Sequence, residues 1–125
     1  MEINSPEVHA EITVAFRRYV QALTDNDIDT VKALFWNSEH TLRYGTGENL
    51  YGMNAINAFR DGQRGQGIDL DITRLVITTF GRDFATANCE MKRLDLGMNC
   101  RMSHSWVRFT EGWRIVAAHV SFGPQ

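Results

Sequence analysis

The most restrictive feature of the sequence is a change in hydrophobic period near Asp69. Before it, apolar side chains recur every three or four residues, as in helices buried on one face. After it they alternate, which predicts half-buried strands over 69–80, 84–95, 99–110 and 113–122, joined by hairpin-sized connections. Helices followed by a long antiparallel meander predict an α+β domain whose curved sheet wraps the first helix and encloses a pocket.

Three helices are expected before the strands. The first begins after Asn4 or Ser5, either of which can cap it, and ends near Leu23. The segment 24–27 breaks that helix and supplies the cap of a shorter one. A third runs from about Met53 to Arg60 and is followed by a glycine-rich loop that ends at Gly67. The inward-facing positions of the third helix are expected to be Met53, Ile56 and Phe59.

Length and composition favour one globular domain over residues 1–125. The net charge is −2 and the basic residues form no stripe, which argues against a nucleic-acid partner. No apolar run is long enough to span a bilayer, so no membrane partner is expected. The first residues lack the pattern of a signal peptide, which predicts a cytoplasmic protein.

The sequence offers little support for metal or covalent chemistry. Cys89 and Cys100 lie within expected strands and without a C-x-x-C spacing, which predicts buried thiols rather than a disulfide or zinc site. Metal-ligand spacings, nucleotide-binding loops and nucleophile elbows are absent, so we expect neither a metal nor a cofactor. Any chemistry should be acid–base or electrostatic.

Residues 41–60 combine two short extended pieces, a glycine turn and a helix, and we expect them to form the mouth of the pocket. Arg43 and Tyr44 end the first extended piece, and Gly45 and Gly47 permit a tight turn. A guanidinium fixed at the end of a strand suits recognition of a planar carboxylate. The alternative is a surface arginine paired with a glutamate.

Tyr19 lies on the apolar face of the first helix, so its hydroxyl is carried into the interior. There it is either a proton donor in the pocket or a core tyrosine bonded to a backbone carbonyl.

Strict alternation in the last strand would place His119 and Ser121 on the same face as Trp113. Both would reach the pocket if that face is the concave one; otherwise His119 is a hydrogen-bonded core residue. Asn88 could enter the cavity from strand 84–95, whereas Glu90 is expected to be solvated.

The two faces of strand 99–110 cannot be assigned from the pattern. One face carries Cys100, Met102, His104 and Trp106, and the other carries Arg101, Ser103 and Ser105. A homodimer is expected because helices cover only one face of the sheet, and Trp106, Met102 and Val116 are available to cover the other.

Four segments of the chain resemble the AtzH-like family, and together they extend over nearly its whole length. They are Phe-Arg-Arg-Tyr (16–19), Leu-Arg-Tyr-Gly to Glu-Asn-Leu-Tyr-Gly (42–52), 78–88 and 112–121. This family belongs to the NTF2-like superfamily of cone-shaped α+β domains, also described as SnoaL-like or ketosteroid-isomerase-like, which are usually homodimers packed through their sheets. The segment 93–101, with Met98, Asn99 and Cys100, departs from the family pattern.

The resemblance implies a function as well as a fold. AtzH-like proteins are associated with breakdown of cyanuric acid and oxalurate, alongside amidase-family hydrolases. The implied reaction is cofactor-independent decarboxylation of 1,3-dicarboxyurea, or a similar N-carboxylated urea, to allophanate. Arg43 would clamp a carboxylate and Tyr19 would donate a proton. The expected substrate-binding residues are Tyr44, Asn88, His119 and Ser121.

Two alternatives belong to other functional classes. The same cone could be a non-catalytic module that binds an acidic metabolite or docks on a partner amidase. A ketosteroid-isomerase-like activity is the weaker alternative, because that chemistry needs a carboxylate base in the pocket and the sequence indicates none.

Overall fold

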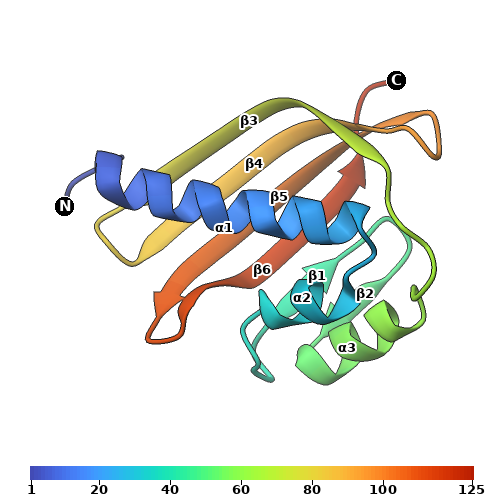
Figure 1. The fold of residues 1–125 in the computed structure, drawn as a ribbon, viewed down its shortest axis with the longest axis horizontal. Helices are drawn as coiled ribbons and strands as arrows, with labels where there is room; N and C mark the ends of the chain where they lie inside the picture. Colours follow the sequence, from blue (N-terminus) through green and yellow to red (C-terminus); the bar gives the residue numbers. More distant parts are fainter.

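The computed structural model describes residues 1–125 and contains three helices and six strands. The helices are α1 (Pro6–Thr24), α2 (Ile28–Ala33) and α3 (Met53–Asp61). The strands are β1 (Leu42–Tyr44), β2 (Asn49–Tyr51), β3 (Leu70–Phe80), β4 (Phe84–Arg93), β5 (Met98–Phe109) and β6 (Gly112–Phe122). Figure 1 shows α1 lying across the four long strands, with α2, α3 and the β1–β2 hairpin gathered at one end.

All six strands belong to one sheet, in the order β2-β1-β6-β5-β4-β3. Strands β3 to β6 form the predicted antiparallel meander. Strand β1 pairs in parallel with β6, with Arg43 opposite Ala118, and so attaches the β1–β2 hairpin to the sheet. The α+β fold with a mainly antiparallel sheet is therefore confirmed. The parallel pairing is what places Arg43 beside the last strand.

The helix starts follow the expected breaks in the pattern. Asp27 caps α2 by accepting hydrogen bonds from the backbone N–H and the hydroxyl of Thr30. Ser5 occupies the N-cap position of α1 but makes no side-chain capping bond. Asn4 instead accepts a bond from the backbone N–H of Thr79, which ties the start of the chain to β3.

The core lies between α1 and the inner face of the sheet. Cys100, Met102, His104 and Trp106 are all buried there, which settles the orientation of β5. The expectation that Trp106 and Met102 are available to cover the outer face is therefore wrong, because both side chains are used by the core. Cys89 is also buried, as predicted for a thiol within a strand.

A β-bulge reverses the faces of the last strand. Ser105 pairs with Ala117 and Trp106 pairs with Ile115, so Val116 is an extra residue without a partner. Trp113 and Ile115 point inward before the bulge, and Ala118 points inward after it, whereas His119 is exposed. The prediction that His119 shares a face with Trp113 is wrong, because one inserted residue shifts the alternation by one position.

Helix α3 turns a different residue toward the interior than the pattern predicted. Met53, Ile56 and Arg60 are buried, and Phe59 is only partly buried. Arg60 retains 2% of its accessible surface, although it is a charged residue. None of the three helices combines the length and apolar character of a membrane span.

Candidate functional site

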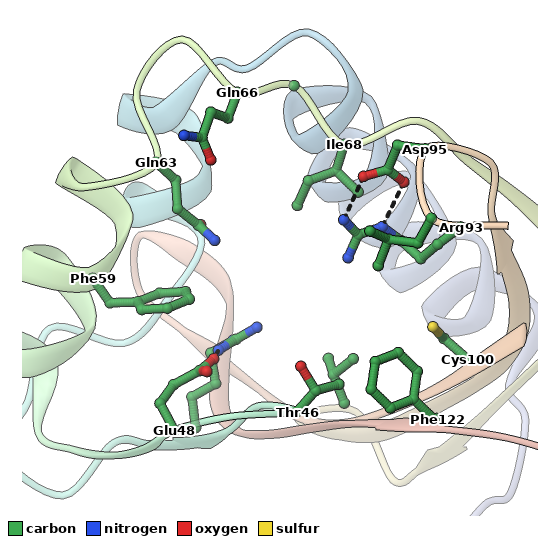
Figure 2. Close-up of a pocket in the computed structure, with 14 residues that line it drawn as sticks. Thr46, Glu48, Phe59, Gln63, Gln66, Ile68, Arg93, Asp95, Cys100 and Phe122 are labelled. Atoms are coloured by element: carbon green, nitrogen blue, oxygen red, sulfur yellow. Dashed lines mark hydrogen bonds and ion pairs between the residues drawn. The ribbon is translucent and has the colours of Figure 1, made fainter. Parts of the chain in front are cut away.

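A cavity of about 310 Å³ opens where α3, the β1–β2 hairpin and the ends of the long strands meet. Phe59 and Gln63 point into it from the α3 side, and Arg93 and Asp95 face them from the β4–β5 hairpin (Figure 2). Its lining residues are Arg43, Thr46, Glu48, Phe59, Gln63, Gln66, Gly67, Ile68, Arg93, Asp95, Leu96, Cys100, Val120 and Phe122. A site of this size holds only a small ligand.

Arg43 is buried in the cavity wall and already has a carboxylate partner. Its NH1 donates to Oε1 of Glu48 at 2.7 Å, and the whole residue retains 8% of its accessible surface. The structure agrees in part with each of the two interpretations of Arg43 drawn from the sequence. Arg43 lines a pocket, as the first requires, and it pairs with a glutamate, as the second requires. A ligand carboxylate would share or compete for this guanidinium.

Gly45 makes room for the Arg43–Glu48 pair. A Cβ at position 45 would clash with the carboxylate of Glu48 and would lie 2.7 Å from NH1 of Arg43. Any side chain there would force the ion pair to move, so the present geometry of the pair depends on this glycine.

Tyr19 lies behind the cavity rather than on its surface. Its hydroxyl accepts a hydrogen bond from NH2 of Arg60 at 2.9 Å, and NH1 of Arg60 donates to Oε1 of Gln63 at 3.0 Å. Because Tyr19 accepts in this bond, its own hydroxyl proton is not used in it. Arg60 therefore links the buried phenol to Gln63, which lines the cavity.

The ring of Phe59 lies against both buried guanidinium groups. Its centroid is 5.0 Å from Cζ of Arg43 and 5.7 Å from Cζ of Arg60. Such contacts stabilise a cation whose hydration has been removed. Burial lowers the pKa of Arg60, and Arg43 adds to the lowering, whereas Tyr19 and Glu48 oppose it.

His104 is a neutral core residue that supports Tyr19. The two rings pack edge to face with centroids 5.1 Å apart, and neither ring nitrogen of His104 has a hydrogen-bond partner. Burial, with the positive charges of Arg43 and Arg60, lowers the pKa of His104 to about 3. An uncharged imidazole is thus built into the interior.

The β4–β5 hairpin forms the wall opposite α3. Arg93 makes a two-pronged ion pair with Asp95, with N···O distances of 2.9 and 2.6 Å. Cys100 lies nearby in the wall, and burial raises the pKa of its thiol. The segment that departs from the family pattern, 93–101, therefore lines the cavity. The structure contains no group of three or more His, Cys, Asp or Glu residues arranged to hold a metal ion.

The other predicted site residues lie on the outer face of the sheet, away from this cavity. His119 follows the bulge and pairs with Ser103, which in turn pairs with Asn88. The hydroxyl of Tyr44 contacts that of Tyr51 at 3.2 Å, and its ring packs edge to face on His119. Ser121 pairs with exposed Arg101 on the same face. Of the six predicted residues, only Arg43 and Tyr19 belong to the interior around the cavity.

Several residues in and directly behind the cavity were not predicted from the sequence. Arg60 could have been found, because it follows Ile56 by four positions on the inward face of α3. Glu48 could also have been found, because it lies across the glycine turn from Arg43. The Arg93–Asp95 pair gave no signal in the sequence, since pairs two residues apart are common on surfaces.

The family model of AtzH-like proteins matches residues 1–125. The chain belongs to the AtzH-like family. A protein of unknown function from Pectobacterium atrosepticum is 47% identical over 98% of this chain and 95% of its own, with a TM-score of 0.92. A cystatin-like fold protein from Burkholderia xenovorans is 40% identical over 100% and 98%, with a TM-score of 0.93.

The AtzH-like chain also resembles an NTF2-like superfamily protein from Salmonella enterica. The two are 25% identical over 97% of this chain and 94% of that one, with a TM-score of 0.79. The fold is therefore NTF2-like. No functionally curated protein matches the chain.

Proposed function

We propose that this AtzH-like chain is a cofactor-independent decarboxylase of a small N-carboxylated urea, with 1,3-dicarboxyurea as its substrate and allophanate as its product. The observation that carries the proposal is a buried arginine, Arg43, in the wall of a small cavity. Its remaining N–H groups suit a ligand carboxylate.

The reaction needs a proton but no electron carrier. The bond between the carboxylate carbon and nitrogen breaks, the electron pair stays on nitrogen, and carbon dioxide leaves. Protonation of that nitrogen, or of the urea oxygen, lowers the barrier. Tyr19 would supply the proton, since Arg60 binds its oxygen and leaves its hydrogen free. Water then restores the proton to the phenol.

The apolar part of the cavity favours loss of charge. Phe59, Ile68 and Phe122 line the cavity together with the arginines. A carboxylate placed against these side chains loses its hydration, and its conversion to neutral carbon dioxide becomes more favourable. Arg43 would meanwhile hold the other carboxylate, so the two ends of the substrate are treated differently.

Proton transfer from Tyr19 to the ligand requires side chains to move. Tyr19 does not line the cavity, so side chains between it and the ligand must shift before a proton is transferred. Gln63 and Phe59 are both partly buried and both contact Arg60, which makes them the side chains whose movement would open this route.

The enclosure of Tyr19 also favours the second candidate, a module that binds an acidic metabolite without turnover. Both functions would use Arg43 in the same way. The test is release of carbon dioxide from 1,3-dicarboxyurea by pure protein, compared with buffer. Acceleration supports the decarboxylase; binding of the same dicarboxylate without acceleration supports the binding module.

A further inference from the structure

Arg60 carries a buried positive charge that is hydrogen-bonded to no carboxylate, although Glu48, the partner of Arg43, acts on it from a distance. Three guanidinium groups lie in or directly behind the cavity. Arg43 is paired with Glu48, and Arg93 is paired with Asp95. Arg60 has only neutral partners, the Tyr19 hydroxyl and the Gln63 amide oxygen, and its Nε has no partner. The interior therefore holds one positive charge in excess.

Gln63 connects this charge to the ligand space. Its amide oxygen is occupied by NH1 of Arg60, so its amide nitrogen is left as a donor. Figure 2 shows the nitrogen end of Gln63 pointing into the open cavity. An amide oriented in this way offers hydrogen bonds to an acceptor and none to a donor.

An unpaired buried cation is costly for a folded protein unless something neutralises it. A small anion in the cavity would do so, and it would meet the Gln63 N–H groups at the same time. We propose that Arg60 is the residue that makes the site selective for an anion, and that it positions Gln63 to donate to the carboxylate which the ligand retains.

This inference rests on the proposed function for the identity of the ligand, which is a dicarboxylate with the length of an N-carboxylated urea. A single excess charge balances a single carboxylate. Gln63 and the free N–H groups of Arg43 would share the retained carboxylate, and the second carboxylate would lie against the apolar side chains of the cavity and be the one that is lost. Binding of the anion itself does not depend on turnover.

The test is Gln63→Glu, which places the missing carboxylate beside Arg60 without changing the size of the side chain. Glutarate serves as the probe, because three atoms separate its two carboxylates, as in 1,3-dicarboxyurea. We expect calorimetric titration to show that glutarate binds at least about tenfold more weakly. The variant loses the hydrogen bond from the Gln63 amide to the ligand carboxylate, and its own carboxylate pairs with Arg60 instead. The melting temperature should rise, because the buried charge acquires a partner.

Gln66→Glu is the matched control. Gln66 also lines the cavity, and its side chain makes no hydrogen bond to Arg60, so the variant adds the same charge without placing it on the guanidinium. It should weaken glutarate binding less than Gln63→Glu and should not raise the melting temperature. Neutral glutaramide should bind the wild type much more weakly than glutarate, because it cannot balance Arg60.

Three results for Gln63→Glu would each overturn the proposal. They are glutarate binding as tight as in the wild type, a loss of affinity no larger than that of Gln66→Glu, and a melting temperature below that of the wild type. Equal binding of glutarate and glutaramide by the wild type would also overturn it. Failure of the proposed reaction is a separate result, because every one of these measurements uses binding or melting and none uses turnover.

Discussion

The Arg43 guanidinium donates to the Glu48 carboxylate at 2.7 Å inside the cavity, so the arginine best placed to bind a ligand is already paired with an acid of its own hairpin. The pair spans the glycine turn between β1 and β2, and Gly45 leaves it the space it needs. Ligand binding must therefore be understood as competition between two carboxylates for one guanidinium.

Replacing Glu48 by glutamine should strengthen binding of a dicarboxylate. The amide keeps the size and an acceptor oxygen but removes the competing negative charge. We expect about tenfold tighter binding of glutarate by calorimetric titration. Glu39→Gln, the same change at an exposed site outside the cavity, should have no effect. Weaker binding by Glu48→Gln would show instead that Glu48 is needed to orient Arg43.

Replacing Arg43 by lysine tests geometry at constant charge. A lysine ammonium cannot serve Glu48 and a ligand with the fixed planar fork of arginine. The affinity for glutarate should fall by about 1–3 kcal/mol, the range for a charge-assisted hydrogen bond, while the thermal melt stays close to that of the wild type. Arg17→Lys on the exposed side of α1 is the control. Unchanged affinity with an unchanged melt would remove Arg43 from the site.

The lowered pKa of His104 predicts that the folded protein loses stability in acid. Its pKa of about 3 in the folded protein lies below the ordinary value of 6.5, so the unfolded chain takes up this proton first as the pH falls. The stability is fully present above about pH 6.5 and is lost progressively toward pH 3. At pH 5 the loss from this group is about 2 kcal/mol.

Denaturant melts of wild type and His104→Phe at pH 7 and pH 5 check this. Phenylalanine preserves a ring against Tyr19 but does not titrate. The decrease in unfolding free energy between the two pH values should be smaller in the variant by about the same amount. Equal decreases in the two proteins would mean that His104 is not held neutral.

We propose a homodimer formed through the outer face of the sheet, as the family resemblance implies. Paired residues Val76, Asn88, Ser103, His119 and Tyr44 make a continuous row across this face. Sedimentation should give twice the chain mass of 14.3 kDa. Ser103→Glu, at the middle of the row, should yield monomers by charge repulsion, whereas Thr110→Glu in the β5–β6 turn should not. A monomeric wild type at micromolar concentration would contradict the proposal.

The fold could be predicted from the sequence because it depends on periodicity that many residues share. The change from helical to alternating spacing at Asp69 located α1 and the four long strands. The faces of β6 could not be predicted, because a single extra residue at Val116 reverses the positions of His119 and Ser121 without altering the apolar pattern that precedes them.

The site was predictable only where its residues are close in the sequence. Arg43 lies in a short hairpin, and the extended pieces and the glycine turn around it predicted a place at the mouth of the pocket, with a surface ion pair as the alternative. The contact between Arg60 and Tyr19 joins residues 41 positions apart, and it depends on where the tertiary fold places α3 relative to α1. Spacing indicates which face of a helix is buried, but it does not indicate which distant side chain that face meets.

The most direct test of the proposed catalytic roles is a comparison of wild type and Tyr19→Phe, measuring both carbon dioxide release from 1,3-dicarboxyurea and affinity for glutarate. Removing one hydroxyl should leave the affinity within about twofold, because Tyr19 does not line the cavity. Turnover should fall by about 100-fold or more, the contribution of a positioned proton donor. A wild type that does not accelerate the reaction, or a Tyr19→Phe variant as active as the wild type, would contradict the decarboxylase mechanism.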